Sequence, residues 1–188
     1  MIDFAPLLAD PVLARALGAA LSVVLLTGAW QKWREPEIFR AALENYRLLP
    51  DGLLAPISRL LPLWEAGAGF LLLLPATRAA GGMLAAALLC VVSAAVVVNL
   101  LRGYGDIDCG CGGIGSSMGE QPLSWALAMR NGILLAALPV ASSEGLPRAM
   151  VSLDYLTVAC GTLALVGLYA SANQLMANHP RLHALRNS

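Results

Sequence analysis

Long apolar stretches separated by short polar segments dominate the pattern of this chain. Five of them approach or exceed the roughly 20 residues that a helix needs to cross a bilayer. They cover residues 11–30, 57–75, 79–101, 124–141 and 151–172. Backbone groups cannot stay unpaired in hydrocarbon, so each stretch is predicted to be a helix. The expected fold is an all-α membrane protein, one integral membrane domain over residues 1–188 with a bundle of about five transmembrane helices.

Composition supports this prediction. Hydrophobic residues make up 58% of the 188 positions and charged residues only 13%, whereas a soluble domain carries about 25% charged residues. The first apolar stretch is too long for a cleavable signal peptide and lacks its basic leading segment, so we expect it to remain as a membrane helix. The net charge is zero and no basic run is present. We therefore expect membrane lipid, and not nucleic acid, around the chain.

Residues 36–47 show a different pattern, with apolar and charged residues repeating at helical spacing. Phe39, Leu43 and Tyr46 fall on one face, and acidic and basic residues that can pair along the helix fall on another. Pro36 suits the first turn. We predict a short amphipathic helix lying in the membrane interface. A water-exposed connecting helix is the alternative.

The chemistry of the chain is concentrated in a cysteine pair, Cys109-Gly110-Cys111, in the polar loop 102–123. If all five stretches span the membrane, this loop, the segment 31–56 and the C-terminal tail share one side, which we call the cysteine face. Cysteines two residues apart can reach the Cα separation of about 4.4–6.8 Å that a disulfide needs. Gly110 removes the side-chain clash that so tight a bend would otherwise create.

So small a ring is expected to be strained, and strained, exposed disulfides exchange readily with other thiols. Closing so short a loop removes little entropy from the unfolded chain, so a bracing role is poorly motivated. We predict that Cys109 and Cys111 are catalytic and pass disulfides to or from a partner. Two alternatives stay open: reduced thiols in a flexible loop, or a soft-metal site for Cu(I) or Zn with Asp106 or Asp108. The loop has no histidine, and a closed zinc site usually has four ligands.

Polar side chains inside the apolar stretches indicate function, because they are costly in a membrane. Glu65 in the second stretch and Arg130 in the fourth reach similar depths below the cysteine face, about 10 Å. We predict that they pair. Asn131 follows Arg130, and Asn99 lies at the cysteine-face end of the third stretch.

The four tryptophans also lie near the cysteine face: Trp30, Trp33, Trp64 and Trp125. One interpretation is a polar, aromatic-walled cavity under the cysteines, able to hold a quinone head group or a segment of a partner. Its predicted pocket residues, which would also tune the thiols, are Glu65, Arg130, Asn131, Asn99 and Trp125. The alternative is interfacial anchoring by the tryptophans together with one structural ion pair.

Three further residues are expected to lie outside the site. Cys90 and Cys160 fall near the middle of the third and fifth stretches, where a free cysteine usually behaves as a small, buried apolar residue. Asp154 begins the fifth stretch, where a negative charge favours the start of a helix.

The run Asp108-Cys109-Gly110-Cys111-Gly112-Gly113, followed by Gln121-Pro122-Leu123-Ser124-Trp125 and Arg130-Asn131, resembles the MauE family of methylamine-utilisation proteins. This family is grouped with DoxX-like redox-associated membrane proteins. The segment Asn45–Pro50 also looks like the one that the family carries after its first span. One position departs from the usual pattern, because Gly112 stands where a phenylalanine commonly follows the second cysteine.

The resemblance implies a role in maturing a periplasmic methylamine dehydrogenase, whose small subunit holds many disulfides, together with a thioredoxin-like periplasmic partner. It also implies kinship with quinone-linked thiol oxidoreductases, so a quinone is the cofactor to consider. The predicted function is a bacterial inner-membrane thiol–disulfide protein assisting this maturation. The alternatives are a non-enzymatic scaffold for the thioredoxin-like partner and a membrane protein that binds a soft metal.

The distribution of basic residues predicts the opposite orientation from the resemblance. Eight lysines and arginines lie toward the cysteine face and three toward the other side, which places the cysteines in the cytoplasm by the positive-inside rule. Delivery of disulfides to secreted proteins requires an oxidising compartment, which is the periplasm in bacteria. We follow the resemblance and expect the cysteine loop on the periplasmic side.

Overall fold

The computed structural model describes residues 10–114, 121–143, 145 and 148–186, and all their regular structure is helical. The elements are α2 (Pro11–Arg34), α3 (Pro36–Asn45), α4 (Asp51–Leu73), the short 3-10 helix η1 (Pro75–Thr77), α5 (Arg78–Leu101), α6 (Trp125–Ala141) and α7 (Ser152–Arg186). Each predicted apolar stretch corresponds to one long helix, so the all-helical prediction is confirmed.

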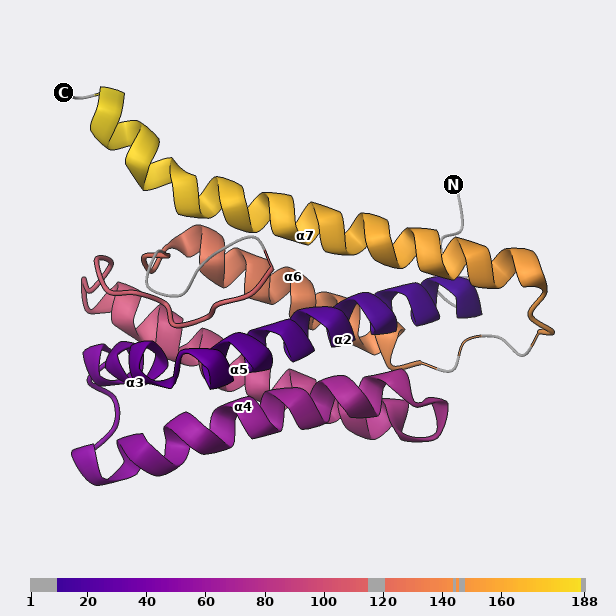
Figure 1. Ribbon diagram of the computed structural model, residues 1–188, viewed down its shortest axis with the longest axis horizontal. Coiled ribbons are helices and arrows are strands. Elements are labelled where there is room, and N and C mark those ends of the chain that lie inside the picture. Colours follow the sequence, from indigo (N-terminus) through magenta and orange to yellow (C-terminus); the bar gives the residue numbers. More distant parts are fainter. Residues whose placement is uncertain (1–9, 115–120, 144, 146–147, 187–188) are drawn as a thin grey trace.

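The five long helices lie side by side along a common direction (Figure 1). Successive helices run in alternating directions, so α3, the loop between α5 and α6, and the C-terminal end of α7 gather at one end of the molecule. This end is the cysteine face. The sequence correctly predicts that these segments share it.

Within the described residues, three helical segments are long and apolar enough to cross a membrane: Pro11–Arg34, Pro75–Leu101 and Ser152–Asn178. The other two long helices do not meet the same standard. α4 carries Asp51, Arg59 and Glu65 within its 23 residues, and α6 has only 17 residues. The structure therefore supports membrane-protein character, and the count of five spanning helices stays a prediction.

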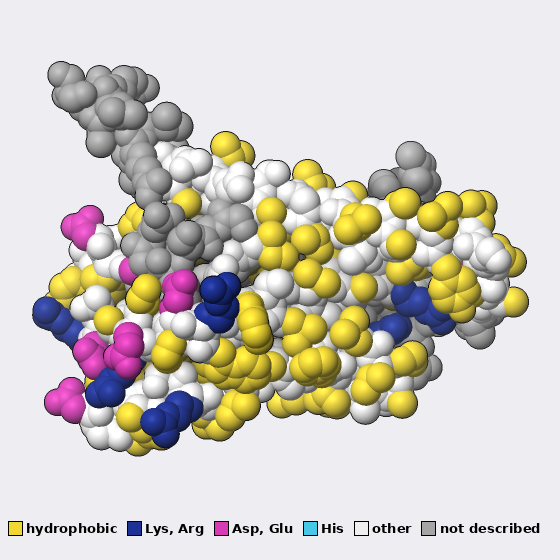
Figure 2. Space-filling model, viewed as in Figure 1, with side chains coloured by type: hydrophobic (Ala, Val, Ile, Leu, Met, Phe, Trp, Pro, Cys, Tyr) yellow, Lys and Arg dark blue, Asp and Glu magenta, His cyan; other side chains and the backbone are white. Residues whose placement is uncertain are grey.

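The surface agrees with a membrane setting. Figure 2 shows apolar side chains over the middle of the molecule, with charged side chains gathered toward its two ends. Leu163, Leu168 and Leu175 of α7 are among the most exposed apolar residues. Cys90 and Cys160 are exposed as well, so the expectation that they are buried inside the bundle is wrong. They lie on its outer face.

The main core is formed where α2, α4, α5 and α6 meet, and close helix contacts depend on small residues there. Its buried residues are Leu21, Leu25, Ala68, Leu72, Ala85, Leu88, Leu89, Leu138 and Ala141. A Cβ on Gly81 would lie 2.5 Å from the backbone nitrogen of Leu72. α7 packs mainly against α2 and takes no part in this core.

The predicted amphipathic helix over 36–47 is present as α3, which ends at Asn45. Its apolar face turns inward: Phe39, Ala42 and the following Tyr46 are buried. On the outer face, Arg40 and Glu44 form the expected i,i+4 ion pair at 3.2 Å. α3 therefore covers the cysteine-face end of the bundle. Its position in a membrane interface remains a prediction.

Candidate functional site

The two loop cysteines are joined in the structure. Cys109 and Cys111 form a disulfide with a Cα separation of 5.1 Å, within the range expected for such a bond. Cys109 is only 5% exposed and packs in a small apolar cluster with Tyr46, Leu123 and Leu127, and Cys111 is partly buried. The expectation of an exposed disulfide is therefore wrong for Cys109, because α3 and the start of α6 cover it.

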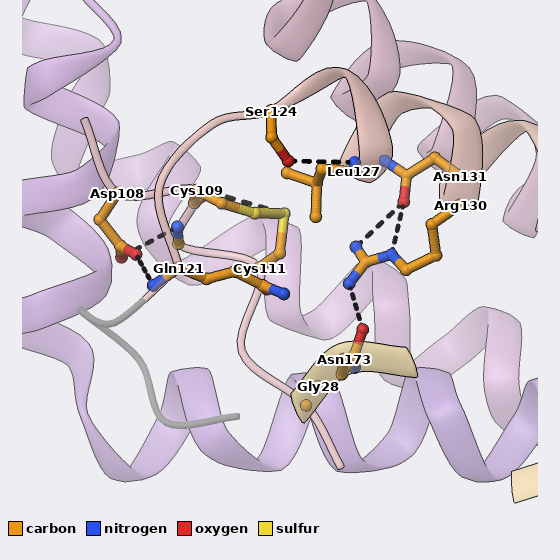
Figure 3. The surroundings of a disulfide bond; sticks show 12 residues. Gly28, Asp108, Cys109, Cys111, Gln121, Ser124, Leu127, Arg130, Asn131 and Asn173 are labelled. Atoms are coloured by element: carbon orange, nitrogen blue, oxygen red, sulfur yellow. Dashed lines mark hydrogen bonds between the residues drawn. A yellow bond between two sulfur atoms is a disulfide. The ribbon is translucent and has the colours of Figure 1, made fainter. Parts of the chain in front are cut away.

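Asp108 organises the loop from within. One of its carboxylate oxygens accepts a hydrogen bond from the backbone N–H of Gly110, and the other accepts one from Gln121, both at 3.1 Å (Figure 3). The backbone N–H of Cys109 in turn donates to the carbonyl of Gln121 at 2.8 Å. These bonds join the two sides of the loop and hold the cysteine pair in a fixed conformation.

Two residues fit the loop against α3. The hydroxyl of Tyr46 donates to the carbonyl of Cys109 at 3.0 Å. Gly110 has φ +63°, and a Cβ there would lie 2.8 Å from the Cβ of Ala42. Glycine is therefore needed between the cysteines both for its backbone conformation and for its close approach to α3.

Burial, and then the negative charge of Asp108, raise the pKa of the Tyr46 hydroxyl above its ordinary value, while the positive charge of Arg130 lowers it.

The loop is also fixed to α2. The side-chain nitrogen of Gln31 donates to the carbonyl of Gly113 at 3.1 Å, and its side-chain oxygen accepts from the N–H of the same residue. Gln31 thus holds both backbone groups of Gly113. The loop is therefore anchored on α2, the end of α3 and the start of α6, and Asn173 of α7 also binds it through the carbonyl of Ile114.

A cavity of about 450 Å³ lies directly beneath the disulfide. Its upper wall includes Cys109, Cys111 and Tyr46, and the rest is formed mainly by apolar side chains of α2, α3, α4, α5 and α6, together with Tyr169 of α7. Few polar side chains interrupt this wall. The disulfide therefore borders a largely apolar chamber in the bundle.

Lys32 and Glu65 form one of the polar features of the cavity. Lys32 Nζ lies 2.7 Å from Glu65 Oε2, and the two side chains are 5% and 12% exposed. The ammonium group also lies 5.6 Å from the centre of the Phe39 ring, within cation–π distance. The predicted pairing of Glu65 with Arg130 is wrong, because α2 supplies the partner of Glu65.

Arg130 is held by two amide side chains instead. Its guanidinium donates to the side-chain oxygen of Asn131 at 3.0 and 3.3 Å and to that of Asn173 at 2.8 Å (Figure 3). It also lies 5.6 Å from the centre of the Tyr169 ring. Among the described residues Arg130 makes no ion pair. The cavity wall therefore carries a fixed positive charge that no described carboxylate neutralises.

Asn131 has one donor to spare. Its side chain is 2% exposed and lines the cavity, and its amide nitrogen Nδ2 has no hydrogen-bond partner among the described residues. Figure 3 shows this nitrogen turned away from Arg130, on the side of Leu127. An unsatisfied buried N–H of this kind is uncommon and calls for an acceptor.

The structure brings together some of the predicted pocket residues and not others. Glu65, Arg130 and Asn131 line the cavity. Asn99 is fully buried in α5 but outside the cavity wall, and Trp125 is 60% exposed on the outer surface. The remaining tryptophans do not line the cavity either; its aromatic residues are Phe39, Tyr46 and Tyr169.

Two important polar residues, Lys32 and Asn173, are missed by the sequence reasoning. In the sequence Lys32 is one of the polar residues that end the first apolar stretch, and Asn173 lies just past the predicted end of the fifth. Asn173 bridges the site, since its oxygen accepts from Arg130 and its nitrogen donates to the carbonyl of Ile114 at 3.0 Å. Its position four residues after Tyr169, on the same helix face, was the available signal.

The described residues contain no group of three or more histidine, cysteine, aspartate or glutamate side chains arranged to hold a metal ion. The loop carboxylate of Asp108 is engaged with backbone N–H groups of its own loop. The soft-metal alternative therefore gains no third ligand from this part of the chain.

Comparison with known proteins gives a consistent result. A family profile described as "Methylamine utilisation protein MauE" matches residues 10–143. The MauE protein of Methylorubrum extorquens is 42% identical over 146 residues, covering 74% of this chain and 77% of the relative. That of Paracoccus versutus is 37% identical over 177 residues, covering 92% and 94%.

No solved structure shows significant similarity to this chain. The family assignment therefore rests on sequence alone, and it includes the whole of the cavity wall except Tyr169. The chain belongs to the MauE family of methylamine-utilisation proteins.

Proposed function

We propose that the chain is a thiol–disulfide exchange protein of the bacterial inner membrane that supports disulfide formation in a periplasmic methylamine dehydrogenase. The observation that carries the proposal is the Cys109–Cys111 disulfide, held by Asp108 and Tyr46 at the mouth of a cavity that contains a fixed positive charge. The dehydrogenase, its disulfide-rich small subunit and a thioredoxin-like carrier are the expected partners.

The exchange would proceed in two steps. A partner thiolate attacks one sulfur of the disulfide to form a mixed disulfide, and the other cysteine leaves as a thiolate. The other thiol of the same partner then attacks the partner sulfur of the mixed disulfide and displaces the cysteine of this chain. The partner gains a disulfide and the chain becomes a dithiol. Cys111 is the more accessible of the two sulfurs, since Cys109 is 5% exposed, and we place the attack there.

Arg130 is suited to assist this step. Its guanidinium lines the same cavity as both cysteines and has no ion-pair partner among the described residues. A nearby cation favours the thiolate over the thiol and so lowers the pKa of a reduced cysteine. Asn131 and Asn173 act as positioning residues, because they hold the guanidinium in place.

The membrane arrangement forms part of the proposal. We propose five spanning helices, because α4 and α6 pack against the more apolar α2 and α5 and expose apolar side chains such as Leu60 and Ile133 on the outer surface. Two of these spans, α6 and α7, follow the cysteine loop, so the loop and the C-terminus lie on the same side. That side is the periplasm if the chain oxidises secreted partners.

A quinone fits the cavity on two structural grounds. The walls are mainly apolar side chains, and the unsatisfied Nδ2 of Asn131 and the Arg130 guanidinium offer donors to carbonyl oxygens. When bound, a quinone would supply a two-electron oxidant for the reduced cysteine pair. In that role Arg130 and Asn131 would orient its head group beneath the disulfide.

Trapping tests the proposal directly. In Cys109→Ser the lone Cys111 thiolate can attack the disulfide form of the partner, which breaks the partner's S–S bond and releases one partner sulfur as a thiolate. No second cysteine of the pair remains to release the partner by attacking this mixed disulfide, so Cys109→Ser should accumulate a mixed disulfide between Cys111 and a partner. Cys111→Ser should accumulate less, because its remaining sulfur is buried. Non-reducing gels and mass spectrometry of the isolated adduct measure both.

The exposed cysteines provide the control. Cys90→Ser/Cys160→Ser should leave the trapped adduct unchanged, since neither residue lines the cavity. If no adduct forms with either single replacement, and Cys109→Ser/Cys111→Ser still supports dehydrogenase maturation, the exchange role is wrong and a scaffold role takes its place.

A further inference from the structure

A second apolar hollow lies on the opposite side of Arg130. This groove, of about 500 Å³, runs between α2, α6 and α7 and is lined by apolar side chains apart from Arg130 and Tyr169. Several of its residues are strongly exposed: Met129 is 67%, Ile133 62% and Leu175 72% exposed. The groove therefore opens onto the apolar outer surface of the bundle.

The cavity beneath the disulfide and this groove share part of their walls. Arg130 and Tyr169, together with Leu21, Val24 and Leu134, line both. The two spaces are therefore adjacent, and the Arg130–Tyr169 contact at 5.6 Å stands at their boundary. A molecule with a polar head and a long apolar tail could occupy both at once.

The polar groups near the boundary select the kind of head group. Arg130 has no ion-pair partner among the described residues, and Asn131 Nδ2 lacks a hydrogen-bond acceptor there. Both groups are hydrogen-bond donors, so they favour an electron-rich acceptor oxygen such as a ring carbonyl. The mainly apolar walls, in contrast, give little support to a bulky zwitterionic phospholipid head group.

We infer that the groove between α2, α6 and α7 is the tail site, and the lateral access, of a long-chain isoprenoid quinone. The head group lies in the cavity near Arg130 and Asn131, and the tail passes Tyr169 into the groove toward the lipid. This inference rests on the proposed function. As the S–S bond forms, the Cys109 and Cys111 thiols lose two electrons and two protons, and the quinone takes up both to become a quinol.

The test is equilibrium binding of radiolabelled ubiquinone to the purified, oxidised protein, in which no exchange can occur. A short-chain form with a single isoprene unit reports on the head site, and a long-chain form also reports on the groove. Leu165 lines the groove, whereas Leu163 on the same helix lines neither space and is 73% exposed. Leu165→Trp and Leu163→Trp are therefore a matched pair.

Leu165→Trp should weaken binding of the long-chain quinone about tenfold by excluding part of the tail, and should change short-chain binding less than twofold. Leu163→Trp should change neither. Arg130→Gln should weaken both quinones. If Leu165→Trp fails to fold, Ala137→Phe replaces it in the test, because it fills the same groove from α6. It should weaken binding of the long-chain quinone in the same way.

The inference is overturned if the groove variants affect long-chain binding no more than Leu163→Trp does. It is also overturned if the oxidised protein binds no quinone saturably, or retains phospholipid that quinone does not displace. Cysteine trapping is independent of this measurement: trapping without quinone binding defeats only the tail site, whereas quinone binding without trapping defeats the exchange role.

Discussion

Single residues determine how the cysteine pair is presented. The hydroxyl of Tyr46 and the small size of Gly110 hold the pair close against α3, and the carboxylate of Asp108 binds the backbone of the loop that carries the pair. The sequence indicates the need for glycine between the cysteines, because the spacing alone demands a tight bend. It does not indicate that Tyr46 binds Cys109, because its place on the apolar face of an amphipathic helix says nothing about where its hydroxyl points.

The ionisation of Tyr46 gives a prediction in alkaline solution. Burial, followed by the charge of Asp108, raises its pKa above the ordinary value of 10.0. Titration of the protein in detergent, followed by tyrosinate absorbance, should therefore give coincident curves for wild type and Tyr46→Phe through about pH 10. A wild-type curve that shows one additional tyrosine ionising near that pH would contradict the buried hydrogen bond.

The same shift has a consequence for stability. The pKa of Tyr46 is raised in the folded state. Its hydroxyl therefore contributes fully to the free energy of unfolding below about pH 10, and this contribution is lost as the pH rises through the folded-state pKa.

Gly110 and Gly105 form a matched pair within the loop. Gly110→Ala should destabilise the loop by at least about 1–2 kcal/mol, because alanine is strained at positive φ and its Cβ meets Ala42. A Cβ on Gly105 would make only an ordinary contact with the carbonyl of Leu123, at 3.8 Å. Quantitative alkylation of Cys109 and Cys111 in a graded thiol buffer measures the effect. Equal disulfide stability in the two variants would show that the close approach to α3 is unimportant.

At the scale of elements, the packing order of the helices decides which polar groups meet. Depth along the bundle correctly places Glu65 and Arg130 on the same side, but depth does not fix the direction in which each helix faces. α4 packs closely against α2, and Lys32 therefore reaches Glu65. Arg130 faces α7 and meets Asn173, which lies beyond the predicted end of its apolar stretch.

The Lys32–Glu65 pair should matter far more than an exposed pair of the same type. Lys32→Met leaves a buried carboxylate without its partner, at a cost of about 3–5 kcal/mol, and Lys32→Met/Glu65→Leu should recover much of it. Arg40→Met removes the exposed partner of Glu44 and should cost less than about 1 kcal/mol. Thermal unfolding in detergent compares the variants. Equal melting temperatures for Lys32→Met and Arg40→Met would contradict a structural role for the buried pair.

At the scale of the whole molecule, apolar stretch length predicts the helices well, and their alternating direction predicts which segments share an end. The cavity and the groove do not follow from these patterns, because each is formed by side chains from several helices whose rotation the sequence does not give. The same limitation explains Cys90 and Cys160, which face outward instead of into the bundle.

The orientation of the molecule is testable with a reporter fused after Ser188. The cysteine loop and the C-terminal end of α7 lie at the same end of the bundle (Figure 1). The proposed function therefore requires a periplasmic reporter signal. A cytoplasmic signal, which the distribution of basic residues favours, would place the cysteines in a reducing compartment and contradict the proposed delivery of disulfides.

The most direct test of the central claim is the thiol content of the methylamine dehydrogenase small subunit in cells that depend on this chain. Cells carrying Cys109→Ser/Cys111→Ser should accumulate small subunit with free, alkylatable thiols and little active enzyme. Cells carrying Cys90→Ser/Cys160→Ser should match wild type. A fully oxidised small subunit and normal activity in the Cys109→Ser/Cys111→Ser cells would contradict the account.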